Sequence, residues 1–266
     1  MRNRFFYALL LSLTLISGCD AFSSEPTYGG LSVGGFNYTP YNLDRFVITD
    51  KYGNKASGGG DLMPGAGQGS LSCCYKLKGT DFTVDWYVYD ADLAIKAIDA
   101  KQPIQDIHKI TQVHLPPTKV AGGAGTRILG LHFYPDDHIE FEFRQDLGGT
   151  RIFYAKIDDW LVKKQGKTFD PHSGEDAAAF RHTARVASEG WIKHRFTNTQ
   201  DLEQYVYFTL LINSKFDEHP AVLKILAETK DKPGAFGAAM EQLPAPIVDE
   251  LKRDQFKHIQ SGAAHG

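Results

Sequence analysis

The chain has 266 residues, with 29 Lys and Arg against 32 Asp and Glu, a formal net charge of −3 and a hydrophobic content of 42%. This slightly acidic balance argues against binding to nucleic acid and against binding to anionic lipid through charge. The apolar content is that of an ordinary globular protein, and a chain of this length buries one large core or two modest ones.

The N-terminus has the pattern of a bacterial lipoprotein signal, predicted for residues 1–18. Two arginines precede an apolar run at residues 5–16, which is too short to span a bilayer comfortably and fits a signal-peptide core. The order Ile-Ser-Gly-Cys at residues 16–19 resembles a lipobox and predicts cleavage before Cys19, followed by acylation of that cysteine. The alternative, an ordinary secretory signal, leaves Cys19 without a role.

Lipidation of Cys19 predicts a protein anchored to the periplasmic side of the cell envelope, because more than one acyl chain gives stable membrane anchoring. Residues 19–30 are expected to form a short polar tether. Asp20 directly follows the cysteine and resembles an inner-membrane retention signal, so the inner membrane is slightly favoured. Loss of residues 1–18 removes two arginines and leaves a net charge of −5.

Residues 31–155 are expected to form a β-rich domain. The segment 81–89 alternates between apolar and polar residues with a period of two, as a half-buried strand does. Pro135-Asp136-Asp137 separates two strand-like runs and predicts a hairpin. Many short strands of this kind predict an antiparallel β-sandwich or a strongly curved sheet. The expected strands are residues 31–38, 44–49, 70–77, 81–89, 107–115, 127–134 and 138–144.

Glycine is concentrated in residues 53–69, between two expected strands. A phosphate cradle would require a following Gly-Lys-Ser/Thr and a helix, and neither is present. The stretch is therefore predicted to be a flexible or bulged β-connection.

Residues 156–262 are expected to be helical and possibly packed on the β-rich domain, so the predicted fold class is α+β. Residues 173–176 resemble a capping box, and apolar residues follow them at spacings of three and four up to Trp191. A second helix is expected at residues 201–213, a third beginning at Pro220 and a fourth beginning at Pro246.

The sequence predicts no enzyme, no metal site and no cofactor. It lacks His-Glu-x-x-His and Cys-x-x-Cys motifs, and its one Gly-x-Ser-x-Gly match, GLSVG at residues 30–34, lies in an expected strand rather than at a strand-to-helix turn. His132, Asp136, Asp137 and His138 surround the expected hairpin and are candidate metal ligands. However, aspartates are common turn residues, and His132 is in strand register with apolar neighbours. Glu140 and Glu142 are expected on the solvated face of their strand.

Five segments in order resemble a bacterial lipoprotein family built on a domain of unknown function. They are GGFNYTPYNLDRFVI at 34–48, GNKASGGG at 53–60, SLSCCYKL at 70–77, FTVDW at 82–86 and LHFYPDDHIEFEF at 131–143. The resemblance covers about residues 33–145. The matching positions are Gly35, Phe36, Asn37, Tyr38, Thr39, Gly58 to Gly60, Cys73, Cys74, Val84 and Trp86.

The resemblance implies an immunity protein, because members of that family are often found beside lipase effectors of the type VI secretion system. Such a protein binds its cognate phospholipase in the periplasm and inhibits it, which requires a complementary surface and no catalytic residue. The alternative is a structural or assembly lipoprotein of the envelope without a toxin partner. A third hypothesis is an envelope hydrolase that uses the region from His132 to His138. The interface residues remain unassigned.

Cys73 and Cys74 are adjacent, and the periplasm is oxidising, which favours disulfides. Adjacent Cα atoms are about 3.8 Å apart, below the usual disulfide range of roughly 4.4–6.8 Å. A vicinal disulfide is one possibility. The other is two reduced thiols on opposite faces of a strand, behaving as small hydrophobic residues.

Overall fold

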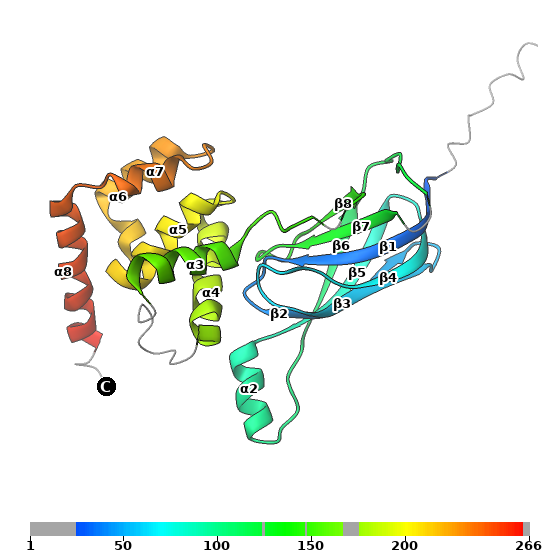
Figure 1. Cartoon of the computed structure of the whole chain (residues 1–266), viewed down its shortest axis with the longest axis horizontal. Helices are drawn as coiled ribbons and strands as arrows, with labels where there is room; N and C mark the ends of the chain where they lie inside the picture. Colours follow the sequence, from blue (N-terminus) through cyan, green and yellow to red (C-terminus); the bar gives the residue numbers. More distant parts are fainter. Residues whose placement is uncertain (1–24, 124–125, 147, 167–175, 263–266) are drawn as a thin grey trace, which may run out of the picture.

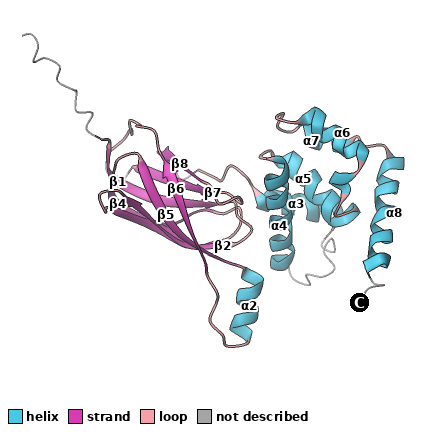
Figure 2. Cartoon of the chain, turned by 180° about the vertical axis from the view of Figure 1, so that it is seen from behind, coloured by secondary structure: helices cyan, strands magenta, loops and turns pink. Residues whose placement is uncertain are grey.

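The structure is a computed structural model that describes residues 25–123, 126–146, 148–166 and 176–262. Strands come first in the chain and most helices follow, so the α+β class predicted from the sequence is confirmed (Figures 1 and 2). The predicted signal at residues 1–18, Cys19 and the first part of the tether lie outside the described residues. No helix among the described residues is both long enough and apolar enough to cross a membrane.

Eight strands form two four-stranded sheets. One sheet has the order β4 (Gly67–Lys78), β1 (Thr27–Asn37), β7 (Arg127–Phe133), β8 (Ile139–Arg144). The other has the order β3 (Lys55–Leu62), β2 (Asn42–Asp50), β5 (Asp81–Tyr89), β6 (Ile107–His114).

All strand pairs are antiparallel except β1 with β7, which pair in parallel from Leu31 opposite Arg127 to Asn37 opposite Phe133. This pair departs from the antiparallel pairing expected from the sequence. It is possible because the chain forms β2 to β6 between the two strands, and parallel neighbours require a long crossover.

Side chains from both sheets share one hydrophobic core. The β5 prediction is confirmed with its bounds: its apolar face is buried and its polar face is partly or fully exposed. Trp86 is fully buried and packs against Phe133, whose ring also contacts Phe46. Burial of each large apolar side chain of this kind contributes about 1.5–3 kcal/mol. The buried residues of β5 are Phe82, Val84, Trp86 and Val88.

The glycine-rich stretch contains a strand, β3, where the sequence predicted a flexible or bulged connection, and its pairing with β2 is bulged between Gly59 and Leu62. A Cβ atom at Gly58 would lie 2.6 Å from Cζ of Phe46, and one at Gly59 would lie 2.4 Å from the backbone oxygen of Asp44. Gly59 also has a φ of +131°. The glycines therefore allow β3 to approach β2 closely, and they do not form a flexible loop.

The helices are α2 (Ala91–Asp99), α3 (Tyr154–Gln165), α4 (Asp176–His194), α5 (Thr199–Tyr207), α6 (Pro220–Thr229), α7 (Ala235–Glu241) and α8 (Ala245–Gly262). A π-helical turn at Phe208–Ile212 extends α5, so the helix expected at 201–213 is present. Pro220 begins α6 as predicted, whereas α8 begins one residue before Pro246. Residues 173–175 of the expected capping box lie outside the described residues.

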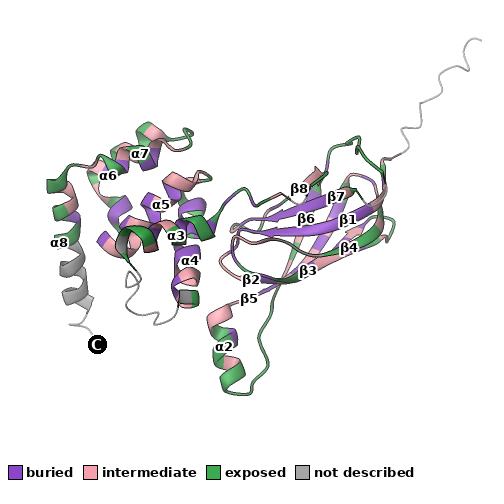
Figure 3. Ribbon diagram, viewed as in Figure 1, coloured by how far each residue is buried: buried purple, intermediate pink, exposed green. Residues whose placement is uncertain are grey.

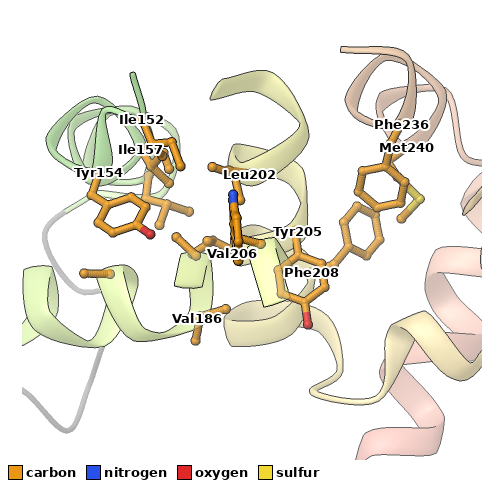
Figure 4. Packing of buried hydrophobic residues seen from close by; sticks show 14 of the residues in the cluster. Ile152, Tyr154, Ile157, Val186, Leu202, Tyr205, Val206, Phe208, Phe236 and Met240 are labelled. Carbon is orange, nitrogen blue, oxygen red and sulfur yellow. The ribbon is translucent and has the colours of Figure 1, made fainter. Parts of the chain in front are cut away.

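The helices after residue 153 enclose a second hydrophobic core (Figure 4). Leu202 and Val206 of α5 are fully buried at its centre, between α3 and α4. Phe36 and Tyr38, from the end of β1 and just beyond it, belong to this cluster as well. The second core therefore extends onto the β-rich part, and the two parts meet at the end of β1.

Two boundaries differ from those expected. β1 begins at Thr27, within the predicted tether, and α3 begins at Tyr154 rather than at residue 156. The helix α2 lies inside the region expected to contain strands. We call residues 25–144 the β-rich part and residues 154–262 the helical part.

Candidate functional site

The strand β7 places His132 in a buried position at the junction of the two parts. The His132 side chain has an exposed fraction of 0%, and its ring stacks on Phe36 with centroids 4.7 Å apart. Its Nδ1 lies 2.9 Å from the Tyr38 hydroxyl, and its Nε2 lies 2.7 Å from a carboxylate oxygen of Glu142. Both ring nitrogens therefore have partners.

Burial, reinforced by the nearby positive charge of Arg151, lowers the pKa of His132, although Glu142 opposes the shift. The imidazole is therefore neutral and carries one proton. Because the Glu142 carboxylate only accepts, Nε2–H of His132 donates to it and Nδ1 accepts from the Tyr38 hydroxyl. The same hydroxyl accepts a hydrogen bond from the backbone N–H of Arg151 at 2.9 Å. Both ring nitrogens of His132 and the Tyr38 hydroxyl therefore all have hydrogen-bond partners within the protein.

Arg151 connects these hydrogen bonds to the outer face of β8. Its guanidinium pairs with Glu140, lies 3.5 Å from Glu142 and donates to the Tyr134 hydroxyl at 2.8 Å. Partial burial opposes ionisation of Glu140, but the bond to Arg151 prevails and holds the pKa of Glu140 below its usual range. Burial raises the pKa of Tyr134 to about 12, so its hydroxyl stays protonated. Glu140 and Glu142 are half-exposed, and both are ion-paired. We call Tyr38, His132, Glu140, Glu142 and Arg151 the junction network.

An aromatic stack from the helical part covers the junction network. Trp191 of α4 stacks on Tyr134 with centroids 5.1 Å apart and also lies over His138. The Arg195 guanidinium lies 4.2 Å from the centroid of the Trp191 ring and donates to Asp136 at 2.9 Å. The residues of the predicted hairpin therefore contact the helical part.

Hydroxyl groups of the helical part also bind the end of β1. The Tyr154 hydroxyl donates to the backbone oxygen of Tyr38 at 2.8 Å, inside a fully buried environment that raises the pKa of Tyr154. Ser188 of α4 lies 3.1 Å from the same hydroxyl. These bonds fix the helical part against the β-rich part, and we interpret the junction as structural.

The four candidate metal ligands are not brought together. His132 binds Tyr38 and Glu142, Asp137 pairs with Lys109 of β6, and His138 binds Asp136. Within the described ranges, no group of three or more His, Cys, Asp and Glu side chains is placed to hold a metal ion.

Cys73 and Cys74 form a disulfide in β4, with their Cα atoms 3.2 Å apart and a cis peptide bond between them. The pairing of β4 with β1 shifts here: Tyr75 pairs with Leu31 and Ser72 with Val33. The two cysteines therefore occupy a bulge. Both are exposed, which differs from the alternative in which one thiol pointed inward.

The exposed apolar side chains are concentrated in another region, from α2 to β6. Leu93 and Ile98 of α2 are 61% and 60% exposed, and Ile110 of β6 is 60% exposed. Half of the large hydrophobic residues that are exposed in the described part lie in this segment, and Figure 3 shows how little of α2 is buried. The segment's members are Leu93, Ile95, Ile98, Ile104, Ile107 and Ile110, which we call the α2–β6 surface.

The helix α2 is held in place at its N-terminal end. The Asp90 carboxylate caps the helix by accepting from the backbone N–H groups of Asp92 and Leu93. Arg181 of α4 binds Asp92 at 2.6 Å, and Arg185 binds both Asp90 and Asp92. These arginines hold the pKa of the Asp92 carboxyl below its usual range against its partial burial. The exposed apolar side chains of α2 are thus carried by an anchored helix.

The strand β6 lies at the end of its sheet, next to β5. Lys109 and Thr111 bind Asp137, so the hairpin after β7 covers one stretch of this edge. Ile110, opposite Asp85 on β5, points away from the shared core. Exposed apolar side chains beside a sheet edge are typical of a protein–protein interaction site.

No protein-family model matches the chain, and neither a curated protein nor a solved structure matches it significantly. The contacts within the structure therefore carry the functional argument. Sequence reasoning missed α2, although Asp90 before a run with apolar residues at 93, 94, 97 and 98 is a helix signal. It also missed Arg151, for which the sequence offers no local signal.

Proposed function

We propose that this protein is a lipid-anchored immunity protein of the periplasm that binds a cognate type VI secretion phospholipase and inhibits it through the α2–β6 surface. We also propose that its two sheets face each other as a β-sandwich, since side chains of both enter one core. The observation that carries the functional proposal is the exposure of six large apolar side chains on the anchored helix, the adjoining strand and the connection between them.

The physical argument is that this surface is costly to leave in water. Full burial of a Leu or Ile side chain contributes about 1.5–3 kcal/mol, so a partner that covers Leu93 and Ile98 gains several kcal/mol from these two residues. Polar residues border the segment, among them Lys96, Asp99 and Asp106. An apolar centre with a polar rim is the usual composition of a specific interface.

The alternative use of the hairpin region, hydrolysis, has less support. A general base needs a nitrogen or oxygen that reaches substrate, whereas both nitrogens of His132 are occupied inside the protein. An inhibitor requires only a complementary surface. Acylation at Cys19 would place that surface where a toxin attacks the periplasmic leaflets.

The test uses the mature chain, residues 19–266, with Cys19→Ser in place of the lipid. Its affinity for the phospholipase encoded beside its gene is measured by calorimetry, together with the residual phospholipase activity. We expect nanomolar binding and loss of activity at an equimolar ratio. A folded protein that leaves the phospholipase unbound and active would contradict the proposal and favour a structural role in the envelope.

A further inference from the structure

A pocket of about 490 Å³ lies in the helical part, away from both the junction network and the α2–β6 surface. Its walls are the end of α4 with the following residues 193–197, and the connection between α6 and α7 at residues 229–233. Its volume falls in the range of roughly 300–1,000 Å³ that is usual for small-molecule sites.

Positive charge dominates the pocket although the chain as a whole is acidic. Lys193, Arg195, Lys230 and Lys232 all line it. Of the two carboxylates in its lining, that of Asp201 is buried and already accepts hydrogen bonds from the backbone N–H groups of Gly234 and Gly237, each at 2.7 Å. Asp231 is exposed at the pocket. The lining therefore has an excess of cations over carboxylates, and one of the carboxylates is occupied.

Several of these cations have capacity for a ligand. Among the described residues, neither Lys230 nor Lys232 is paired with a carboxylate, and Lys232 donates to the backbone oxygen of Glu228. The guanidinium of Arg195 is stacked on Trp191 and bonded to Asp136, so it is already engaged at the junction. Lys193 is shared with Asp217 at 3.1 Å. The ammonium groups of Lys230 and Lys232 therefore have capacity to bind one anion, with Lys193 on the facing wall.

The pocket also has an apolar wall, made by Phe196, Leu226 and Pro233. Phe196 is fixed by stacking on Phe236, with centroids 4.6 Å apart. Arg195 and Asp231, one on each wall, have positive φ angles of 58° and 59°. Such a conformation costs a non-glycine residue free energy, and it persists where the surrounding structure imposes it. Both walls are therefore sharply turned, defined segments.

We propose that this pocket binds a small organic phosphate. Lys230 and Lys232 bind the phosphate group, with Lys193 on the facing wall, and Phe196 packs against the organic part. A phosphate ester suits the site because its anionic oxygens accept from several cationic donors at once, and ammonium groups are common phosphate ligands. The ligand chemistry has two sources: a free phosphate ester, or the headgroup of a phospholipid in the membrane near the anchor. The proposal is independent of toxin binding.

The experiment is a titration of the isotope-labelled mature chain, with Cys19→Ser, followed by amide NMR. The probes are inorganic phosphate, glycerol 3-phosphate, glycerol as the uncharged control, and vesicles of phosphatidylglycerol in phosphatidylcholine against pure phosphatidylcholine. The test variant is Lys230→Glu with Lys232→Glu. A matched variant, Lys76→Glu with Lys119→Glu, makes the same change of net charge at exposed positions of the β-rich part.

We expect glycerol 3-phosphate to shift the amides of residues 193–197 and 229–234, and glycerol to shift none. Affinity falls by about tenfold or more in the test variant, because two charge-assisted bonds are lost, and is unchanged in the matched variant. Asp231→Asn tightens binding, since it removes a carboxylate from the pocket.

A response to glycerol 3-phosphate identifies a free ester as the source, whereas a response confined to phosphatidylglycerol vesicles identifies the lipid headgroup. The proposal is overturned if no probe shifts these amides in the millimolar range. It is equally overturned if the test variant and the matched variant lose affinity to the same extent, because the attraction would then be one of net charge.

Discussion

The junction between the two parts and the α2–β6 surface treat their side chains in opposite ways. At the junction, His132 is fully buried, both of its nitrogens are bonded, and Trp191 closes the contact. On the α2–β6 surface, Leu93 and Ile98 are largely exposed on a helix whose N-terminal end is fixed by ion pairs.

The side chains at the junction stabilise the fold, whereas those of the α2–β6 surface are exposed and can bind a partner. A polar network that is complete within the chain stabilises one arrangement and has little capacity for a ligand. Apolar side chains that are exposed on an anchored helix contribute free energy to binding when another protein buries them. The residue types most suggestive of catalysis are thus in the structural region, and the ordinary aliphatic residues are in the candidate functional one.

The largest expected effect is on the junction between the two parts. Trp191→Ala should lower the free energy of unfolding by about 3–5 kcal/mol, because it removes a buried aromatic side chain and leaves a cavity at the junction. Urea denaturation checks this. Trp160→Ala is the matched control, since Trp160 is only partly buried and should cost less. A loss below about 1 kcal/mol for Trp191→Ala would mean that the stack does not hold the parts together.

The second effect is on the α2–β6 surface. Leu93→Asp with Ile98→Asp should weaken phospholipase binding by about 2–4 kcal/mol and leave the melting temperature unchanged, because these side chains are exposed in the free protein. Ile192→Asp with Leu223→Asp, at exposed positions of α4 and α6, is the matched control. Equal losses of affinity in both double variants would show that the α2–β6 surface is not the binding site.

The third effect is a pH dependence near neutral pH, which His132 should give to the junction. The pKa of His132 is lowered in the folded state, so the unfolded chain binds the proton more readily below the usual value of 6.5. Stability is therefore fully present above about pH 6.5 and decreases as the pH falls below that value.

Urea midpoints at several pH values measure this slope. His132→Gln should flatten it, whereas His108→Gln, at a half-exposed position, should retain it. Glu140 and Asp136 also have lowered pKa values, but they act at lower pH, below their usual values of 4.5 and 3.8. A slope that is the same with and without His132 would show that its burial does not control the junction.

The smallest effect is on the anchor of α2. Arg181→Ala with Arg185→Ala should destabilise α2 locally by about 1 kcal/mol, because the pairs with Asp90 and Asp92 are partly buried. Faster hydrogen exchange at residues 91–99 measures this. Lys224→Ala, which breaks an exposed pair with Glu228, should change nothing. Unchanged exchange in the double variant would mean that α2 is held by its cap alone.

Local sequence patterns predicted the strands and helices in which buried and exposed residues alternate regularly along the chain. The alternation in β5 identified its strand and its buried face, and Pro220 identified the start of α6. The strand β3 was missed because its glycines serve the close approach of Phe46, which a sequence pattern does not reveal. The partners of His132 were missed because Tyr38 lies 94 residues away in the chain. The pocket was missed for the same reason, since Arg195 and Lys230 meet only after folding.

The most direct measurement is hydrogen exchange of the chain alone and in complex with the proposed phospholipase partner. We expect hydrogen exchange over residues 91–110 to slow on binding, and exchange over residues 127–144, at the junction, to stay unchanged. Protection confined to the helical part, or to residues 53–66 of the β-rich part, would contradict the claim that the exposed α2–β6 surface is where the inhibitor meets its target.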